Sequence, residues 1–415
     1  MKEYYLWLLQ LMGAANPKSL LLIQRYGSAE LAYEAIAREN DVRFLSPAEK
    51  KRLAALSLDN SERILEECGN KGIGIITLDD GDYPYRLKNI YNPPLLLFYK
   101  GSLKGLNSEV CISGVGARGA TEYTAKVTKR TCTDLAKLGV ILVSGMANGV
   151  DHIIHSSAVE AGGKTIGVLA CGIDVDYPRG SSQLRKQICD LSGAYISELM
   201  PNTPASKAYF QARNRIISGL SLGTIVFQAG MGSGSLITAD HAVQQGRDLF
   251  CFPPRDVFSA DYCGVIKYLR DGAIPLFNYL DVVNYYFDSF TDKLDELNRK
   301  YDVSPEKHFA FGKSKTDAGD DTSVSGKNAD KGIRKKTSSA CVKRGGDAAE
   351  KFGFDKNEPE YKVIYDFLKQ NGKQQLEAIT DSCNISPDDI SLYLLELEMA
   401  DVIESFPGAY YGLKL

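Results

Sequence analysis

The chain has 415 residues, of which 44% are hydrophobic and 24% are charged, and its net charge is −3. This composition indicates a soluble globular protein of two or three domains, and it excludes a protein that binds nucleic acid through an overall basic charge. The nine cysteines form no Cys-x-x-Cys pair, and no segment is apolar for long enough to span a membrane. We therefore expect a cytoplasmic protein with reduced thiols, no metal site and no membrane partner.

Residues 1–75 contain segments of helical periodicity separated by turn signals, for example Ala15-Asn16-Pro17. This pattern predicts a small helical domain. Residues 76–108 contain Tyr83-Pro84 and Pro93-Pro94 and are predicted to be an extended connection. From residue 109 to residue 290, apolar segments alternate with helical ones. Strands are predicted at 110–113, 140–144, 165–170, 194–197, 224–227 and 249–252. This alternation is typical of right-handed βαβ units, and it predicts an α/β fold with an extended Rossmann-like, doubly wound parallel sheet.

The first of these strands ends in a G-x-G-x-x-G sequence at residues 114–119, where a dinucleotide-binding loop would lie. An NAD site also needs an acidic residue at the end of the second strand, and no carboxylate follows that strand before Asp151. A dinucleotide enzyme is therefore one alternative. Arg118 within the loop is better explained as a phosphate ligand, because a guanidinium group matches the geometry of phosphate oxygens.

A helical segment with Arg213, Asn214 and Arg215 leads into the strand 224–227, which is followed by a Gly/Ser loop at the start of another helix. Backbone N–H groups and hydroxyls in residues 230–238, together with the helix dipole, favour an anion at this point. Ligands of doubly wound sheets bind at the carboxyl ends of the strands, where residues 114–118, 144–151, 171–179 and 230–238 all fall. Arg179 adds a second cation that can face the same crevice as Arg118, so the pattern favours a binding platform for a row of phosphates.

Two other groups could carry chemistry. Asp151, His152 and His155 share one helical turn, but no third metal ligand is evident, so helix capping by Asp151 and a packed, hydrogen-bonded His155 are favoured over a metal or acid/base site. Glu198, at the end of the fourth strand, is either an acid/base group or a ligand of a loop backbone.

The C-terminal part of the sequence contains a linker and one more domain. Residues 303–355 are predicted to be a disordered linker, since residues 312–351 contain no aromatic residue and few apolar ones. Basic residues from Lys331 to Arg344 are either a solvated face of this linker or an auxiliary nucleic-acid tether. Residues 356–415 contain helical segments at 361–370, 374–383 and 387–399, followed by two short strands.

Together these segments resemble the DNA-processing protein A (DprA/Smf) family. The resemblance rests on residues 116–118, 144–151 with His155, 162–166, 176–179, 197–198, 210–221 and 233–239. It implies that residues 1–75 are a SAM-like domain, residues 109–290 a Rossmann-like single-stranded DNA-binding domain, and residues 356–415 a winged-helix domain. It also implies that the protein is not an enzyme, needs no cofactor, binds and protects single-stranded DNA, and loads a RecA-type recombinase onto it during natural transformation and recombination.

In this family the residues that match Arg118 and Arg179 contact DNA. The full set of predicted DNA-binding residues is Gly116, Arg118, Ser144, Gly145, Asn148, Arg179, Arg213, Asn214, Arg215, Ser233, Gly234, Ser235 and Thr238. The resemblance and the apolar run at residues 273–277 further predict a homodimer to which residues 268–283 contribute. The last predicted helix carries Asp389, Glu396 and Glu398 and no basic residue, so the C-terminal domain is not expected to be the main DNA reader.

Two alternatives remain open. A related Rossmann-like group hydrolyses nucleoside monophosphates with a glutamate at the comparable turn, where this chain has Thr238. A hydroxyl cannot supply the charge that the transition state of glycosidic cleavage requires, which argues against this nucleoside monophosphate phosphoribohydrolase activity. A scaffold protein without affinity for DNA would leave the arginines at the sheet edge unexplained.

Overall fold

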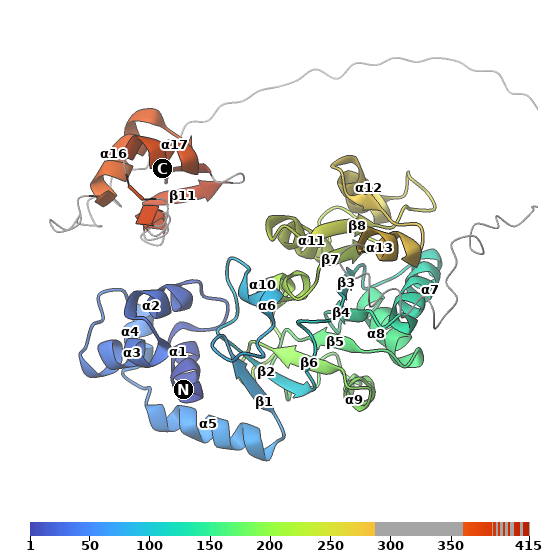
Figure 1. Ribbon diagram of the computed structural model, residues 1–415, viewed down its shortest axis with the longest axis horizontal. Helices are drawn as coiled ribbons and strands as arrows, with labels where there is room; N and C mark the ends of the chain where they lie inside the picture. Colours follow the sequence, from blue (N-terminus) through green and yellow to red (C-terminus); the bar gives the residue numbers. More distant parts are fainter. Residues whose placement is uncertain are drawn as a thin grey trace, which may run out of the picture. The chain divides into compact units, whose positions relative to one another are not determined.

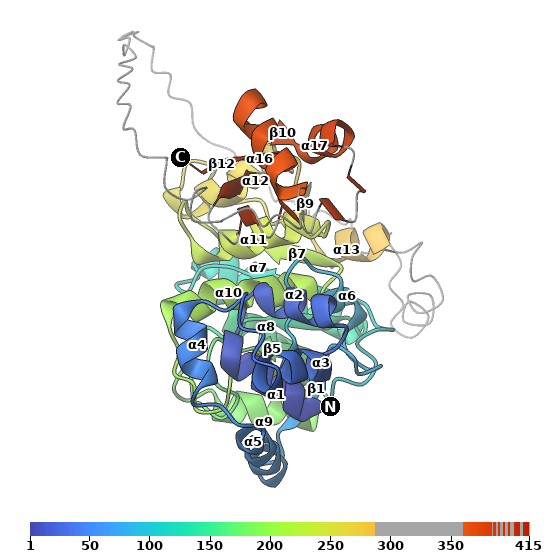
Figure 2. The same cartoon turned by 90° about the vertical axis from the view of Figure 1, so that its left-hand side faces the viewer.

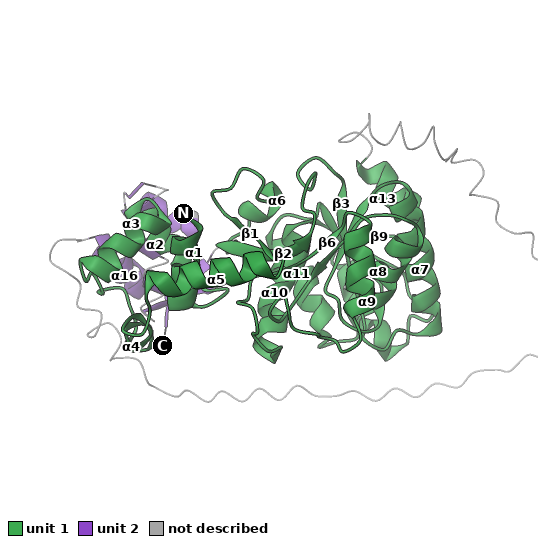
Figure 3. Ribbon diagram, turned by 90° about the horizontal axis from the view of Figure 1, so that it is seen from below, with its two compact units in different colours: residues 1–314 green, residues 315–415 purple. Residues whose placement is uncertain are grey.

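The computed structural model describes residues 1–286 and, in the C-terminal part, residues 360–383, 385–386, 389–390, 393–394, 397–398, 402–406 and 410–414. The chain divides into two compact units, residues 1–314 and residues 315–415 (Figure 3). The predicted linker at 303–355, with its basic residues, lies outside the described residues. None of the helices that the structure describes has both the length and the hydropathy of a bilayer span.

The N-terminal helices precede the sheet and lie together (Figure 2). They are α1 (Lys2–Met12), α2 (Lys18–Tyr26), α3 (Ala29–Tyr33), the π-helical turn η1 (Glu34–Arg38), α4 (Pro47–Leu53) and α5 (Leu58–Asn70). Serine side chains cap three of them, and Ser46 forms a reciprocal capping box with Glu49 at the start of α4. Helix α1 is buried on most of its surface and contributes Trp7 to a core that continues into the sheet. These features agree with a helical domain, while the SAM-like assignment stays a prediction.

A nine-stranded sheet forms the centre of unit 1 (Figure 1). Its strands are β1 (Gly74–Thr77), β2 (Leu96–Gly101), β3 (Cys111–Val115), β4 (Ile141–Ser144), β5 (Thr165–Val168), β6 (Ala194–Ser197), β7 (Gly223–Val226), β8 (Asp248–Cys251) and β9 (Ile274–Pro275), in the spatial order β1-β2-β6-β5-β4-β3-β7-β8-β9. All neighbours from β6 to β9 pair in parallel, which confirms the predicted parallel sheet. The six predicted strands correspond to β3–β8.

The predicted extended connection at 76–108 is wrong in one respect. Part of β1 and all of β2 fall within it, and β2 pairs antiparallel with both β1 and β6. The run from Leu95 to Phe98 is completely buried, so this segment contributes core side chains as well as connecting two domains. Its short helix α6 (Tyr85–Lys88) lies between the two strands. Pro93 and Pro94 just before β2 hid this strand from sequence reasoning, since proline disfavours an interior strand.

Helices cover both faces of the sheet. Helices α7 (Glu122–Lys137), α8 (Val150–Glu160) and α13 (Tyr279–Tyr286) pack on one face, while α10 (Lys207–Gly219), α11 (Gly234–Gln244) and α12 (Cys263–Arg270) pack on the other. Helix α9 (Ser182–Asp190) follows β5, and a 3-10 turn, η2 (Ala260–Tyr262), precedes α12. The strands alternate accordingly: Cys111 belongs to one core and Ile112 to the other. Burial on both faces explains why the strands read as continuous apolar runs.

Strand β3 is the point at which the sheet changes direction. From β3 the chain continues to β4 and β5 on one side, and later returns to place β7 and β8 on the other side. The loops that leave β3 and the adjacent strands therefore diverge and leave a crevice at the carboxyl ends, which is the usual ligand site of such sheets.

The C-terminal unit has its own small core. Helices α16 (Glu360–Asn371) and α17 (Leu376–Cys383) accompany a three-stranded antiparallel sheet of β10 (Gln374–Gln375), β12 (Tyr410–Leu413) and β11 (Ile403–Phe406). Buried Ile364, Leu368 and Ile379 pack in this core. The predicted third helix at 387–399 is described only at some of its residues. The winged-helix assignment stays a prediction.

Candidate nucleic-acid interface

A hollow of about 280 Å³ lies at the switch point of the sheet. Its lining comes from the loops after β3 and β4 and from the helices α8, α10 and α11. The lining residues are Val115, Gly116, Arg118, Ala147, Asp151, Phe210, Arg213, Asn214, Ile217, Ser233, Gly234, Ser235 and Thr238. We call this set the switch-point hollow. Eight of the thirteen residues predicted from the sequence line it: Gly116, Arg118, Arg213, Asn214, Ser233, Gly234, Ser235 and Thr238.

The loop after β3 is fixed against the start of α8. The N–H of Val150 donates to the carbonyl of Ala117 at 3.1 Å. A Cβ atom at Gly116 would lie 2.6 Å from Cγ2 of Val150, so this position requires glycine. Gly149 has a φ of +80° and would press any side chain into the Arg118 carbonyl. The backbone that carries Arg118 is therefore held in one position.

Arg118 itself is exposed, and its guanidinium carbon lies 5.1 Å from the ring centroid of Phe210. The Tyr177 ring lies 5.5 Å from the Phe210 ring, and both rings are partly exposed. Arg179 is exposed two residues beyond Tyr177, in the loop after β5. Arg179 does not line the hollow, so it extends the interface beyond it. Arg118, Phe210 and Tyr177 thus follow one another at the carboxyl edge of the sheet, and Arg179 is exposed on the same loop as Tyr177.

Arg213 provides a buried positive charge in the hollow. Its Nη1 donates to the carbonyls of Gly145 and Val168, and its Nε donates to Oδ1 of Asn214 at 3.2 Å. Burial lowers the pKa of its guanidinium to about 10, and the nearby Asp151 carboxyl acts in the opposite direction. Arg213 therefore keeps its charge at neutral pH, on a side chain that the backbone holds in place.

Asp151 is the acidic residue of the hollow. Its Oδ2 accepts a hydrogen bond from the N–H of Ala147 at 3.3 Å. Burial raises the pKa of Asp151, while the charge of Arg213 acts in the opposite direction. The prediction that Asp151 caps α8 is therefore wrong, because the N-cap residue is Gly149. Asp151 lies in the first turn of α8 and accepts a hydrogen bond from the preceding loop.

The first turn of α11 closes the other side of the hollow. Ser233 is the N-cap, and its Oγ accepts from the N–H of Ser235 at 3.4 Å and lies 2.7 Å from the Ser235 hydroxyl. Asn214 donates to the carbonyl of Gly234 at 3.1 Å, which connects this turn to Arg213. The positive end of the α11 dipole and the Arg213 guanidinium thus face one cavity, an arrangement that suits a phosphate group.

Three of the predicted residues lie beside the hollow rather than in it. Ser144 is fully buried and donates to the carbonyl of Gly114 at 2.8 Å, so it ties β4 to β3. Gly145 is buried against the Arg213 guanidinium, where a Cβ atom would collide with it. Asn148 is exposed on the loop before α8. Ser144 and Gly145 shape the site, and of the three only Asn148 is accessible.

Arg215 does not reach the switch-point hollow. Its Nη2 forms a buried ion pair with Oε1 of Glu198 at 2.7 Å, and its Nε donates to the carbonyl of Asn92 at 2.8 Å. Glu198 also accepts the N–H of Ala15 at 3.0 Å. This network joins the N-terminal helices to the sheet. Glu198 was predicted to be either an acid/base group or a ligand of a loop backbone, and in the structure it binds a loop backbone. Arg215 points away from Arg213 because residues two positions apart in a helix do not share a face.

His155 is a packed residue of the core. His155 is fully buried, its Nδ1 lies 2.8 Å from Oγ1 of Thr165, and burial lowers its pKa to about 3. The prediction of a packed, hydrogen-bonded His155 is confirmed. Across the residues that the structure describes, no group of three or more potential metal ligands occurs.

Sequence reasoning missed Phe210 and Tyr177 as members of the interface. Phe210 is one helical turn before Arg213, so the two side chains share a face of α10, and Tyr177 is two residues before Arg179. An aromatic residue two or three positions before a predicted phosphate ligand could have indicated these two rings, because bases stack on exposed rings.

Known proteins resemble this chain. A family model described as DNA recombination-mediator protein A matches residues 74–287. The DNA processing protein DprA of Bacillus subtilis strain 168 is 39% identical over 239 residues, which are 58% of this chain and 77% of that protein. The DprA of Streptococcus pneumoniae strain R6 is 41% identical over 174 residues, which are 42% of this chain and 61% of that protein. The X-ray structure of DprA from Streptococcus pneumoniae has a TM-score of 0.59 at 30% identity and covers 68% of this chain and 98% of its own.

Proposed function

The chain belongs to the DNA recombination-mediator protein A family, and we propose that it holds single-stranded DNA across the switch-point hollow and loads a RecA-type recombinase onto that strand. The family is one of DNA-binding mediators and not of enzymes, which agrees with the prediction that the protein has no catalytic activity. The observation that carries the proposal is the row of Arg118, Phe210, Tyr177 and Arg179 beside the buried cation Arg213.

The row suits a single strand for two reasons. Arg118 and Arg179 are exposed on successive loops, where they can pair with successive phosphates of one backbone. Phe210 and Tyr177 pack against each other next to Arg118 with partly exposed rings, and unpaired bases stack on such rings whatever their sequence. The hollow, with Arg213 and the first turn of α11, accepts one phosphate group from the strand. We therefore expect little base preference and a strong dependence of affinity on salt.

A nucleotide-hydrolysing activity is the weaker alternative. Thr238 lines the hollow with only 1% of its surface exposed, at the position where the related hydrolases have a catalytic glutamate. The one carboxylate among the described lining residues, Asp151, is buried and hydrogen-bonded to the loop. Neither group is placed as an accessible acid beside an anionic ligand, so binding is favoured over cleavage.

We further propose that two copies associate through α12 and the β9 edge of the sheet. Strand β9 is the last strand of this sheet, and Ile266 and Leu269 are apolar and only partly buried on α12. Within the predicted apolar run, Leu276 is completely buried, so it stabilises the fold and is not available to a partner. Light scattering should give twice the chain mass at micromolar concentration, and a monomer mass would refute this association.

Residues 1–314 alone should bind single-stranded DNA. All the residues assigned to the interface lie in this unit, and none of them lies in the C-terminal unit. Fluorescence anisotropy with labelled oligo-dT should give an affinity for residues 1–314 within about twofold of that of the full chain. If the shortened protein folds but loses binding, the DNA site lies in the C-terminal part and the hollow is wrongly assigned.

A further inference from the structure

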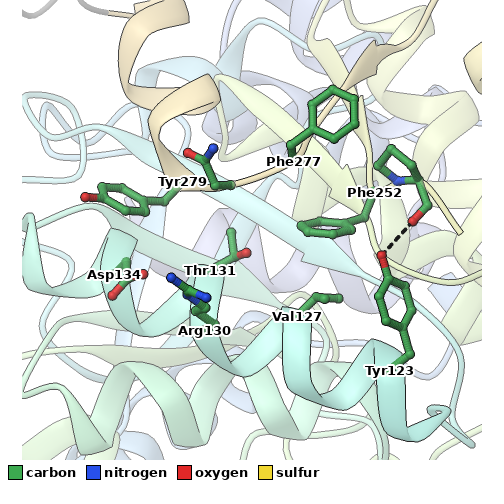
Figure 4. A pocket seen from close by; sticks show the side chains of 10 residues that line it. Tyr123, Val127, Arg130, Thr131, Asp134, Phe252, Phe277 and Tyr279 are labelled. Atoms are coloured by element: carbon green, nitrogen blue, oxygen red, sulfur yellow. Dashed lines mark hydrogen bonds between the residues drawn. The ribbon is translucent and has the colours of Figure 1, made fainter. Parts of the chain in front are cut away.

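A second cavity, of about 340 Å³, lies between α7 and the start of α13 (Figure 4). We call it the aromatic pocket, because four of its ten lining residues are aromatic, namely Tyr123, Phe252, Phe277 and Tyr279. Arg130 of α7 also lines it. The functional site described above uses none of these residues.

The aromatic pocket opens on the same edge of the sheet as the switch-point hollow. Phe252 directly follows β8, and Phe277 follows β9, so both lie at carboxyl ends of parallel strands. Strand β8 is two places from β3 in the sheet, which corresponds to about 10 Å. The loop between β3 and α7 borders both sites, with Arg118 at its start and α7 beginning at its end. A strand that passes Arg118 can therefore continue along α7 to the pocket.

The pocket has a basic rim. The exposed face of α7 carries Lys126, Lys129, Arg130 and Lys137, and the only acidic residues of this helix are Glu122 and Asp134. One of the cations, Lys129, pairs with Glu160 of α8 at 2.8 Å. The rim therefore carries more positive than negative charge and can attract a polyanion. The wall of the pocket combines aromatic rings with polar residues, among them the carboxylate of Asp134. Nucleic acid combines the same two properties, charged phosphates and flat bases.

The wall presents one ring to solvent on a rigid support. Phe252 stacks on Phe227 with 6.0 Å between ring centroids, and the Tyr123 hydroxyl donates to the carbonyl of Pro253 at 3.0 Å. Phe277 is 65% exposed, although its N–H donates to Asp281 at 2.7 Å and thereby fixes its backbone. An exposed ring on a fixed backbone can accept a stacked base at a small entropic cost.

We propose that the aromatic pocket is a second contact for single-stranded nucleic acid, in which a base stacks on Phe277 while Arg130 and Lys126 bind the adjoining phosphates. The inference rests on the proposed function, since it continues the strand that the switch-point hollow holds. In this proposal the strand leaves the switch-point hollow along α7. Stacking and phosphate contacts predict no base preference at this contact.

The test compares oligonucleotides of two lengths. A short oligo-dT of roughly six nucleotides fills the first site only, whereas one of roughly twenty nucleotides reaches both. Phe277→Ala and Arg130→Glu should each weaken binding of the long oligonucleotide by about 5- to 100-fold and leave the short one unchanged. Phe258→Ala and Arg63→Glu are the matched controls, because Phe258 is 93% exposed, Arg63 is exposed on α5, and neither residue belongs to the pocket or its rim.

A tryptophan reporter gives a second readout. The single natural tryptophan, Trp7, is completely buried, so the wild-type protein supplies the background signal. The emission of Phe277→Trp should be quenched when the long oligo-dT is added, as a stacked base would require. Light scattering of Phe277→Ala should still give the mass of the wild-type protein.

The outcomes separate this inference from the proposed function. If the wild-type protein binds neither oligonucleotide, the proposed function fails. If it binds both and Phe277→Ala binds them equally well, only the second contact is refuted. An unchanged tryptophan emission of Phe277→Trp on addition of the long oligo-dT would also overturn the inference. A loss of dimer mass in Phe277→Ala would overturn it as well, because the pocket would then belong to a contact between subunits.

Discussion

Replacing Arg118 and Arg179 together by glutamate is expected to abolish binding of single-stranded DNA. Each arginine makes a charge-assisted phosphate contact in the proposed interface, so Arg→Ala at either position should cost about 1–3 kcal/mol of binding free energy. Glutamate adds repulsion to the lost contact. Both side chains are exposed, and the fold should be unaffected. Anisotropy with oligo-dT measures the affinity, and a variant with Arg52→Glu and Arg63→Glu, two exposed residues of α4 and α5, is the control for net charge.

The two positions should respond differently to lysine. Arg118 lies over the Phe210 ring on a rigid loop, so the planar guanidinium contributes stacking as well as charge. Arg179 lies in an exposed loop, where a point charge can serve, and Arg179→Lys should keep more affinity than Arg118→Lys. Filament formation by a RecA-type recombinase on the coated strand should fall in parallel with the DNA affinity. A double glutamate variant that folds and binds oligo-dT normally would show that this edge of the sheet is not the DNA site.

Replacing Glu198 by alanine should lower the free energy of unfolding by about 3–5 kcal/mol, because it leaves the buried guanidinium of Arg215 without its counter-charge. The side chains of this pair are only 7% and 9% exposed. The N–H of Ala15 loses its acceptor as well, which weakens the attachment of the N-terminal helices. Urea unfolding followed by circular dichroism measures the change.

The matched control is the exposed ion pair between Arg38 and Glu34, whose removal by Glu34→Ala should cost less than about 1 kcal/mol. Under conditions in which Glu198→Ala remains folded, its affinity for oligo-dT should equal that of the wild-type protein. A strong loss of DNA affinity in the folded variant would instead place Arg215 and Glu198 in the DNA interface.

The parallel strands of the sheet could be predicted because each of them has a local pattern. Each of the six predicted strands is a short apolar run between helical segments, and connections between parallel strands are short and right-handed. The same reasoning placed Arg118 and the first turn of α11 at one edge, because loops that follow parallel strands converge there. Strands β1 and β2 were not predicted in this way, since they are antiparallel strands outside the alternating strand–helix pattern, and β2 pairs with β6 across about 95 residues.

The candidate site was predicted less completely than the fold. Arg213 and Arg215 are equivalent in the sequence, and only the fold decides that one faces the hollow while the other pairs with Glu198. Ser144 and Gly145 belong to the predicted motif, but their burial shows that they position other groups. The stacking of Arg118 on Phe210 joins residues that are 92 positions apart, and such a contact has no local signal.

The central claim is that exposed arginines at the switch point bind the phosphates of a single strand. The most direct measurement is the affinity of the full chain for oligo-dT and for a matched duplex as a function of salt concentration. We expect the protein to bind the single strand more tightly than the duplex. The logarithm of the binding constant should fall linearly with the logarithm of the salt concentration. The magnitude of this slope should decrease by about 0.7 for each phosphate contact that is removed at Arg118 or Arg179. Affinity that is independent of salt, or that favours the duplex, would contradict the account.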